Sequence, residues 1–490
     1  MPNLIDYLVF RAKLDPKSIA LQGVGRQFTF EQLLRVAKKT GGKLRQLGVK
    51  PGQLVVTSIP DGYVDWIVTL GLFHEAAITC SNHGHAALDS SFDYDWMITD
   101  RMVDHFPADK TIQIDTDWLK GLRNLSQEID QMDYPSDQSL IRICLTSGTT
   151  GQRKAVGLDI NRTVARVKHG AALGSSSNRI SLIKLSSAAN FNAAVTCLMA
   201  GSPLYCANSN REAVDLIRQF SIETLHGSPN QIGSLIQHLV ARNQTLDCLG
   251  TVRCAGGALT PNLIKSIEAH LCKNVYNPYG STEAGGACVF KASSNSDSSS
   301  HGLPEPDAKI QVVDEFDNPL PAGEDGLVRI QTAYMVHEYY KNPEASAQSF
   351  KQGWFYPGDR GSLTKEGRLV LAGRNSELIN RGGVKIDPAD IDQFLTGYPG
   401  IEDAAAFGIE DKLGVQQLAV AIVMSETVDL KVLKAALMKK FGVARCPSVF
   451  LRMKQIPRNQ MGKVMRADIG KKFAESAKKK LDESRPTLND

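Results

Sequence analysis

The segment from Thr146 to Lys154 (TSGTTGQRK) combines hydroxyl, glycine and cationic residues and has almost no apolar side chain. Glycines let a backbone approach a ligand closely, hydroxyls and N–H groups donate hydrogen bonds, and cations neutralise negative charge. Together these properties suit a polyphosphate. The alternative is a solvated turn rich in Ser, Thr and Gly, which such a composition often forms. The residues concerned are Thr146, Ser147, Gly148, Thr149, Thr150, Gly151 and Lys154.

The segment does not match the Walker A phosphate loop, in which four residues separate two glycines and Lys-Ser or Lys-Thr follows at once. Here two residues separate Gly148 from Gly151, and Ala155 follows Lys154. The spacing therefore argues against a P-loop kinase or GTPase.

Four further segments are rich in polar residues that a hydrophobic core would exclude. They are Asn277–Ala284, Gly353–Asp359, Gly373–Ile386 and Ile456–Val464. In the first, Glu283 stands beside hydroxyls at an expected strand end, which suits Mg²⁺ bound to phosphates, and Tyr279 could stack on a base. In the second, Asp359 can accept hydrogen bonds from two ribose hydroxyls. Each segment taken alone also has an ordinary explanation as an exposed turn.

The elements that must position these segments follow from hydrophobic patterning. An apolar run at 140–145 predicts a strand that leads into the first segment. Helix–turn–strand units are expected at Phe28–Thr57, Ala213–Leu225 and Ile264–Tyr276. Such alternation indicates an α/β sheet with helices on its faces.

The pattern changes after residue 300. Short strands are expected at Lys309–Val313, Gly326–Ile330 and Arg368–Leu371, which indicates an antiparallel β subdomain. From Gly373 onward, helices and strands alternate in a region of about 115 residues, which is within the usual range for a domain. This region is predicted to be a small α+β domain.

Composition limits the possible functions. The chain has 490 residues, of which 42% are hydrophobic and 22% charged, as in a globular protein of two or three domains. A net charge of +4 is too small to indicate a nucleic-acid partner. Nine cysteines without a C-x-x-C pair favour reduced thiols in a cytoplasmic protein. The N-terminus lacks the pattern of a signal peptide, and no transmembrane segment is expected.

In order and spacing, the five segments resemble the motifs of the adenylate-forming (AMP-binding) superfamily. This superfamily includes acyl-CoA synthetases, stand-alone adenylation enzymes and firefly luciferase. Thr146–Lys154 is similar to its [ST]-S-G-T-T-G-x-P-K loop. The other matches are Tyr279–Glu283 to Y-G-x-T-E, Trp354–Asp359 to W-x-x-[ST]-G-D, Gly373–Pro388 to the hinge segment and Pro457–Lys463 to P-x-[ST]-x-x-G-K. The resemblance covers nearly the whole chain.

The resemblance implies an α/β fold in two domains. Residues 1–375 would form a large AMP-binding domain of two α/β sheets plus the antiparallel β subdomain. Residues 376–490 would form a small mobile α+β lid that carries the catalytic lysine.

The resemblance also implies a reaction in two steps. A carboxylic acid attacks the α-phosphate of ATP, bound with Mg²⁺, and pyrophosphate leaves. A thiol then displaces AMP from the acyl-adenylate. We expect an ATP-dependent acid–thiol ligase that uses coenzyme A. A stand-alone adenylation enzyme that loads a carrier-protein phosphopantetheine is the near alternative, and a non-catalytic nucleotide-binding scaffold is the second. The identity of the acid and the oligomeric state stay open.

Each matched residue thereby acquires an expected role. The residues of the phosphate loop hold the β- and γ-phosphates, Thr282 contacts the α-phosphate, and Glu283 ligates Mg²⁺. Lys463 bridges the carboxylate and the α-phosphate. The remaining nucleotide-binding residues are Gly256, Gly257, Ala258, Tyr279, Gly280, Ser281, Asp359 and Arg374. After the lid rotates about Ser376, the loop of Arg381, Gly382 and Gly383 lines the thiol tunnel.

Three departures from the family pattern affect the expected activity. Arg153 stands where the loop usually has Pro, and Ser376 stands where the hinge usually has Asp or Lys. The stretch Leu185–Asn192 replaces P-x-[FY]-H, which ordinarily lines the acyl pocket, so an unusual acid is expected. Amino-acid activators typically place an Asp near Phe191, but this chain has none between residues 178 and 210. A plain α-amino acid substrate is therefore not favoured.

Overall fold

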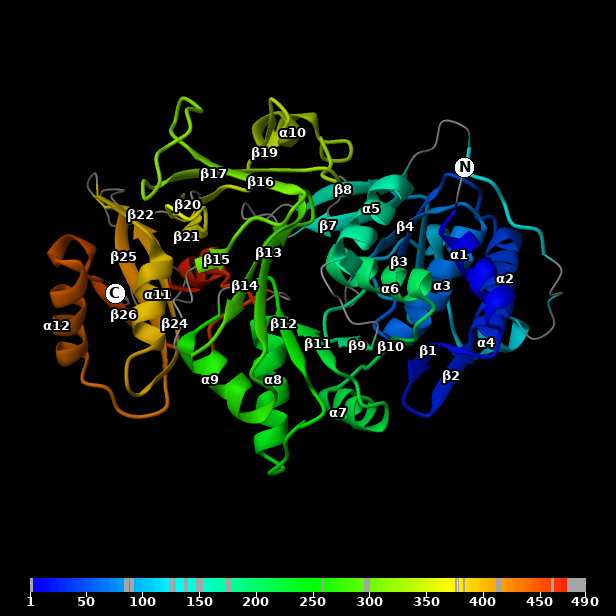
Figure 1. Cartoon of the computed structure of the whole chain (residues 1–490), viewed down its shortest axis with the longest axis horizontal. Coiled ribbons are helices and arrows are strands. Elements are labelled where there is room, and N and C mark those ends of the chain that lie inside the picture. The colour runs from blue at the N-terminus through cyan, green and yellow to red at the C-terminus, as the bar shows by residue number, and fades with distance from the viewer. Residues whose placement is uncertain are drawn as a thin grey trace, which may run out of the picture.

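The computed structural model describes residues 3–82, 88, 92–122, 125, 129–135, 140–146, 153–172, 178–257, 259–294, 300–374, 377, 379–381, 384–410, 416–459 and 462–473 (Figure 1). Within these ranges the chain forms two mainly parallel sheets, an antiparallel β subdomain and a small α+β unit at the C-terminal end. The expected fold class is therefore confirmed.

The first sheet has the strand order β6-β5-β3-β4-β7-β8. Its strands are β3 (Leu54–Ser58), β4 (Ile78–Ser81), β5 (Trp96–Thr99), β6 (Thr111–Gln113), β7 (Leu140–Thr146) and β8 (Lys154–Asp159). β3 and β4 are buried along their whole length, as is usual for parallel strands covered on both faces. β7 and β8 pair antiparallel, with Thr146 opposite Lys154. The phosphate segment is therefore the connection between two paired strands.

The second sheet has the order β14-β13-β12-β11-β9-β10-β1-β2. Its strands are β1 (Ile19–Gly23), β2 (Arg26–Thr29), β9 (Arg179–Ser181), β10 (Leu204–Tyr205), β11 (Thr224–Gly227), β12 (Thr251–Cys254), β13 (Val275–Ser281) and β14 (Gly285–Ala292). The strands from β10 to β13 are parallel neighbours, so their carboxyl ends meet at one edge.

Helices cover both sheets. They are α1 (Leu4–Leu14), α2 (Phe30–Gln46), α3 (Gly62–His74), α4 (Thr116–Gly121), α5 (Ile160–Ala172), α6 (Ala188–Ala200), α7 (Asn210–Gln219), α8 (Pro229–Val240) and α9 (Pro261–His270). α7, α8 and α9 pack an apolar core against one face of the second sheet, in the lower part of Figure 1. α6 packs with α1 and α5 and contacts the same sheet at β10. The expected helix at 28–47 is α2, which begins after the capping box formed by Thr29 and Gln32.

The β subdomain confirms the expected antiparallel region. Its strands are β15 (Ser300–Gly302), β16 (Ala308–Val313), β17 (Gly326–Thr332), β18 (Phe350–Lys351), β19 (Trp354–Phe355), β20 (Asp359–Leu363) and β21 (Leu369–Arg374), and α10 (Pro343–Ser349) precedes β18. β20 and β21 pair antiparallel with Asp359 opposite Arg374. The pairing brings two expected nucleotide-binding residues side by side.

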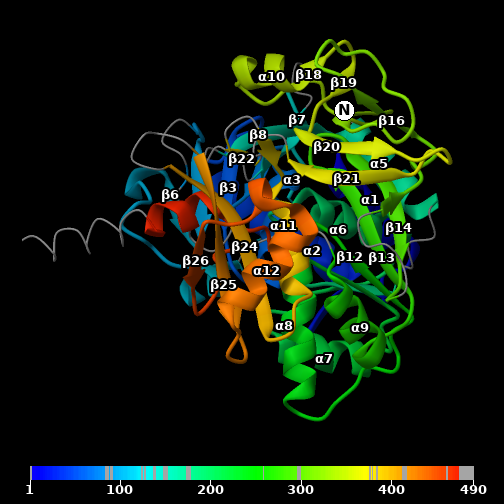
Figure 2. The same ribbon diagram turned by 90° about the vertical axis from the view of Figure 1, so that its left-hand side faces the viewer.

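The C-terminal unit is built on the sheet β24-β25-β26 and a separate hairpin. Its elements are β22 (Ile379–Arg381), β23 (Val384–Ile386), α11 (Pro388–Thr396), β24 (Ile401–Glu410), β25 (Gln416–Met424), α12 (Leu430–Phe441) and β26 (Val449–Arg452). A short 3₁₀ helix at Val443–Arg445 follows α12, and another at Ala108–Lys110 precedes β6 of the first sheet. Figure 2 shows this unit from its own side, with α11 and α12 in front of the strands. The division at residue 376 stays a prediction, because Ser376 lies outside the described residues.

The two faces of this small sheet pack against different parts of the C-terminal unit. Ala404, Ala406 and Val420 pack against the helical layer. Phe407 and its neighbours on the other face pack against Ile456 and Ile469, which flank the segment with Lys463. The alternation of side chains along β24 therefore fixes the Lys463 segment on the face away from α11 and α12.

One expectation about local structure needs correction. The polar motif at 279–283 was expected beyond a short strand at 274–276. β13 instead continues to Ser281 and pairs with β14 from Gly285 onward. Because β14 supplies hydrogen bonds to the polar residues of the motif, the strand does not end where its apolar residues end.

The cysteines are reduced in the structure, and the described helices are not membrane-spanning. All nine cysteines are free thiols, and most of them are buried. Among the described residues, no helix combines the length and the apolar character needed to cross a membrane. The cytoplasmic location stays a prediction.

Asp387 gives a pH-dependent prediction for the folded state. Its side chain caps α11 by accepting from the Ala389 N–H at 2.8 Å, and it lies against the backbone of Gly373. Burial raises the pKa of Asp387 from 3.8 to about 7. Between these values the folded chain keeps a proton that the unfolded chain has lost, so stability falls as pH rises from about 4 to about 7.

We therefore expect Asp387→Asn, which keeps a capping side chain, to lose this decline. The melting temperature of the wild type should fall by roughly a few degrees relative to the variant between pH 5 and pH 7.5. Asp429→Asn is the matched control, because Asp429 caps α12 at an exposed position. Parallel melting curves for wild type and Asp387→Asn across this range would contradict the prediction.

Candidate functional site

The Asp359 carboxylate joins the second sheet to the β subdomain. Asp359 is only 7% exposed. Its Oδ2 accepts a hydrogen bond from the Tyr279 hydroxyl at 2.6 Å, and its Oδ1 pairs with Arg374 Nε at 3.0 Å. Burial and the neighbouring carboxylate raise the pKa of Tyr279 well above its ordinary value, so its hydroxyl stays a donor. Three expected nucleotide-binding residues thus form one connected group.

The glycines after β12 lie beside this group. Gly256 has a φ of +90°, a conformation that favours glycine. The Asn277 side chain donates to the Gly257 carbonyl at 3.1 Å and ties this loop to β13. The loop of Gly256 and Gly257 and the strand with Tyr279 are therefore neighbours, as the stacking of a base between them requires. Ala258 lies outside the described residues.

The turn between β13 and β14 places Thr282 and Glu283. A side chain at Gly280 would lie 2.2 Å from the Gly285 carbonyl oxygen, so the close pairing requires glycine there. The Ser281 hydroxyl accepts from the Ala284 N–H at 3.0 Å and closes the turn. This turn exposes the Thr282 side chain in part and buries Glu283.

Arg166 of α5 stabilises the same turn, and this role was not predicted from the sequence. Its guanidinium donates to the carbonyls of Thr282 and Glu283, both at 3.0 Å, from α5. Hydrogen bonds from charged groups contribute roughly 1.5–3 kcal/mol each. The available signal was weak: Arg166 follows the buried Thr163 by three residues, so both lie on the inner face of an amphipathic helix.

Tyr339 connects the acid Glu283 to the cation Lys154. The Tyr339 hydroxyl donates to Glu283 Oε1 at 2.8 Å, and Lys154 Nζ lies 4.6 Å from the centre of the Tyr339 ring. Burial raises the pKa of Tyr339, and the Glu283 charge adds to the effect. No sequence signal pointed to this tyrosine. The contacts bring the phosphate segment of the first sheet to the expected metal ligand of the second.

Lys463 enters the same region from the C-terminal unit. Gly462, with a φ of +79°, lies against Asn230 of α8, and Arg458 donates to the Gly462 carbonyl at 2.8 Å. Although the Lys463 side chain remains reachable by solvent, burial and the Arg374 charge lower its pKa. The carboxylates of Asp359, Glu377 and Glu283 act in the opposite direction. The Lys463 amine therefore lies within electrostatic range of both expected nucleotide and metal residues.

Arg466 secures the segment that carries Lys463. It pairs with Glu377 at 2.9 Å and with Asp392 at 2.7 Å, and it donates to the Ala406 carbonyl at 2.6 Å. Removing one partner from a buried pair costs about 3–5 kcal/mol. Arg466 therefore links the Lys463 segment to Glu377, the residue directly after the expected hinge position.

The remaining expected residues divide into those outside the described part of the chain and those with contacts elsewhere. Ser147, Gly148, Thr149, Thr150, Gly151, Gly382 and Gly383 lie outside the described residues. Arg381 binds within its own unit, to Gln417 at 3.1 Å and to the Cys446 carbonyl at 2.8 Å. The departure at Arg153 has a partner of its own, because its guanidinium donates to Asn82 at 3.1 Å.

The chemistry of the donors fits a metal-bound nucleotide. Within the described ranges, no cluster of three or more His, Cys, Asp or Glu side chains could hold a metal ion by itself. Mg²⁺ commonly binds through one or two carboxylates and completes its shell with water and phosphate oxygens. The buried acid Glu283, linked through Tyr339 to Lys154 of the expected phosphate loop, fits that pattern.

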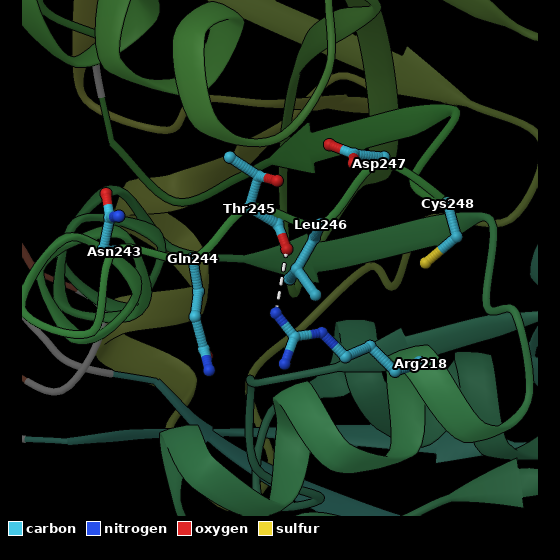
Figure 3. A pocket seen from close by; sticks show the side chains of 7 residues that line it. All are labelled: Arg218, Asn243, Gln244, Thr245, Leu246, Asp247 and Cys248. Carbon is cyan, nitrogen blue, oxygen red and sulfur yellow. Dashed lines mark hydrogen bonds between the residues drawn. The ribbon is translucent and has the colours of Figure 1, made fainter.

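A crevice of about 460 Å³ lies elsewhere and is not part of this group. Figure 3 shows its lining residues, with Arg218 donating to the Thr245 carbonyl at 3.1 Å. Its loop, residues 243–248, precedes β12, so the crevice lies at the amino-terminal edge of the second sheet. The expected site residues meet at the opposite edge.

Comparison with known proteins identifies the family. Residues 9–340 match the AMP-binding enzyme family, and residues 390–463 match the AMP-binding enzyme C-terminal domain. Oxalate–CoA ligase of Saccharomyces cerevisiae is 31% identical over 47% of this chain, and that match spans 43% of the relative. 4-Chlorobenzoate–CoA ligase of an Arthrobacter species is 24% identical over 93% of this chain and 91% of its own.

A solved structure shares the whole fold. The o-succinylbenzoate CoA synthetase of Bacillus subtilis, in complex with an acyl-adenylate intermediate, superposes with a TM-score of 0.82 at 21% identity and covers 96% of this chain and 98% of its own. The family matches, which cover most of the chain, and the shared fold lead to one conclusion: the chain belongs to the AMP-binding enzymes, the adenylate-forming superfamily.

Proposed function

We propose that the protein activates a carboxylic acid with ATP and transfers the acyl group to the thiol of coenzyme A. The observation that carries this proposal is that Lys463 lies within electrostatic range of Asp359, Arg374 and Glu283, which come from separate parts of the chain. A reaction between a carboxylate and a triphosphate needs cations and donors that offset their repulsion. The relatives described above are CoA ligases, which supports coenzyme A as the acceptor.

In the first step a carboxylate oxygen attacks the α-phosphorus of ATP, and the bond to pyrophosphate breaks. Lys463 would bridge the two anions, and Lys154 with the rest of its loop would hold the departing phosphates. Asp359 would accept the ribose hydroxyls while Arg374 keeps its carboxylate in place. Mg²⁺, when bound by Glu283, would neutralise charge on the phosphates.

In the second step a thiol sulfur attacks the acyl carbonyl, and AMP leaves with the bonding electron pair. For this step Lys463 has to withdraw, and we propose that residues 376–490 rotate as a lid about Ser376. A compact point charge on a flexible stem suits delivery and withdrawal by a moving domain. The loop of Arg381, Gly382 and Gly383 would then approach the thiol.

The two alternatives predict different acceptors or none. A carrier-protein phosphopantetheine offers the same thiol chemistry, so comparison of coenzyme A with a loaded carrier protein separates these functions. A non-catalytic scaffold has no need for Lys463 near the nucleotide residues. The retention of five charged residues, Lys154, Glu283, Asp359, Arg374 and Lys463, favours an enzyme.

ATP–pyrophosphate exchange tests the first step directly. We expect at least one acid in a panel of fatty, aryl, dicarboxylic and amino acids to support exchange that requires Mg²⁺, and plain α-amino acids to be poor substrates. Thioester formation with coenzyme A should follow for the same acid. The absence of exchange with every acid in the panel would refute acid activation and favour the scaffold.

Lys463→Ala should separate the two half-reactions. Because Lys463 serves the first step, exchange should fall by about 100-fold or more, whereas thiolysis of a supplied acyl-adenylate should be nearly unchanged. Lys472→Ala is the control, since it removes an exposed lysine from the helical stretch that follows. Equal losses in both half-reactions would show that the lysine does not act in the first step alone.

Asp359→Asn should weaken ATP binding. The amide loses the ion pair with Arg374 and one strong acceptor for the ribose, so the Kd for ATP should rise by about 10-fold or more. Calorimetric titration measures this change. Asp325→Asn is a suitable control, because it removes a carboxylate that pairs with Arg360 in the same β subdomain. Unchanged ATP affinity in Asp359→Asn would remove this residue from the nucleotide site.

A further inference from the structure

A row of polar side chains crosses the second sheet, a few residues from the carboxyl edge at which the proposed site lies. The strand register places Ser181 beside His226, His226 beside Arg253, and Arg253 beside Tyr276. The residues that alternate with them, such as Leu225 and Val252, belong to the apolar core under α7, α8 and α9. Successive side chains of a strand point to opposite faces, so the polar row lies on the face turned away from those helices.

Arg179 extends this row by one further step away from the carboxyl edge, because it pairs with Thr224. It is 7% exposed, and its Nε and Nη2 have no hydrogen-bond partner. α6 lies over it: burial raises the pKa of the Cys197 thiol on that helix, and the Arg179 charge opposes the rise. Buried guanidinium donors without partners are rare in folded proteins, and their presence points to a missing acceptor.

Other polar atoms around the row also lack partners. They are His226 Nε2 on the sheet, and Asn190 Oδ1 and Asn192 Oδ1 in the first turns of α6. The stretch from Leu185 to Asn192 is the one that replaces the family's usual acyl-pocket sequence.

The charges of this group do not cancel within it. Burial and the charges of Arg253 and Arg179 lower the pKa of His226 to about 3, so this imidazole is neutral at pH 7. Glu305 acts on Arg253 at longer range, but its carboxylate is bound to His169. Neither Arg179 nor Arg253 has a carboxylate within 4.0 Å among the described residues. Within the described part of the chain, the two cations Arg179 and Arg253 therefore have only the more distant carboxylate of Glu305 to offset their charge.

The row lies at a defined depth below the nucleotide residues. Arg253 precedes Gly256 by three residues, and Tyr276 precedes Tyr279 by three. At a rise of about 3.3 Å per residue, Arg253 lies roughly 10 Å from the edge where the acyl-adenylate would form, and Arg179 lies further from it. A short diacid spans this distance with one carboxylate at each end.

We propose that Arg253, with His226 and Arg179 behind it, forms the closed end of the acyl pocket and binds a second, anionic group of the substrate. The acid activated by this protein would then be a dicarboxylic acid, or an acid with an equivalent distal anion. This inference rests on the proposed acid activation. The distal carboxylate would supply the negative charge that the two cations Arg253 and Arg179 lack within this group.

Matched acids of equal length test the proposal: octanoate with suberate, and hexanoate with adipate. For the wild type, kcat/KM in ATP–pyrophosphate exchange should favour the diacid of a pair by about tenfold or more. Arg253→Met should lower the diacid value by about the same factor and leave the monoacid value unchanged or higher. Arg253→Lys, which keeps the charge, should retain part of the preference.

Two further measurements guard against an unfolded variant and a general loss of activity. Arg218→Met removes a cation at the opposite edge of the same sheet and should leave the preference unchanged (Figure 3). Calorimetric binding of suberate, together with the melting temperature, should show weaker binding by Arg253→Met in a folded protein.

The outcomes separate the two proposals. Exchange with monoacids but not with diacids would overturn the anionic pocket and leave acid activation in place. If Arg253→Met lowered kcat/KM by the same factor for the diacid and the monoacid, Arg253 would have a structural role, and the pocket proposal would also be overturned. No exchange with any acid would refute acid activation, and the pocket proposal with it.

Discussion

The arrangement of the site depends on one constraint: charged side chains of both signs are gathered, largely out of water, at the carboxyl edge of the second sheet. Carboxyl ends of neighbouring strands meet there, and their loops bring Gly256, Tyr279 and Glu283 together without further adjustment. Charged groups in such a place need partners, because removing them from water is costly. Asp359 therefore holds both Tyr279 and Arg374, and Glu283 holds Tyr339. These contacts also bind the β subdomain to the sheet.

The same requirement explains how the small C-terminal unit can deliver a lysine. Lys463 itself makes few fixed contacts, whereas its neighbours Arg458 and Arg466 are tied to Asp403, Asp392 and Glu377. The supporting arginines form a rigid base for the loop, and the lysine remains free to meet an anion. Its lowered pKa reflects burial near Arg374, and an incoming phosphate or carboxylate would relieve the repulsion between these two cations.

Much of the site could be predicted from the sequence, because its motifs consist of residue types that have no packing role. Lys154, Glu283, Asp359, Arg374 and Lys463 stand in glycine-rich polar segments, and a core would exclude them. Arg166 and Tyr339 could not be predicted, since each lies in an ordinary amphipathic or aromatic context. Their importance arises from contacts more than a hundred residues away for Arg166 and 56 residues away for Tyr339.

The sequence by itself determined the order of the elements, the fold class and the identity of the polar motifs, because periodicity, turn residues and local spacing are properties of short segments. Only the tertiary structure decided that β13 runs on through the Tyr279 motif to pair with β14, and that Asp359 faces both Tyr279 and Arg374. It also decided that Arg179 is buried with unpaired donors, and that Arg179 and Arg253 share one face of the sheet, because this face is assembled by the pairing of distant strands. Strand pairing and side-chain burial depend on residues far apart in the chain, and no local pattern records them.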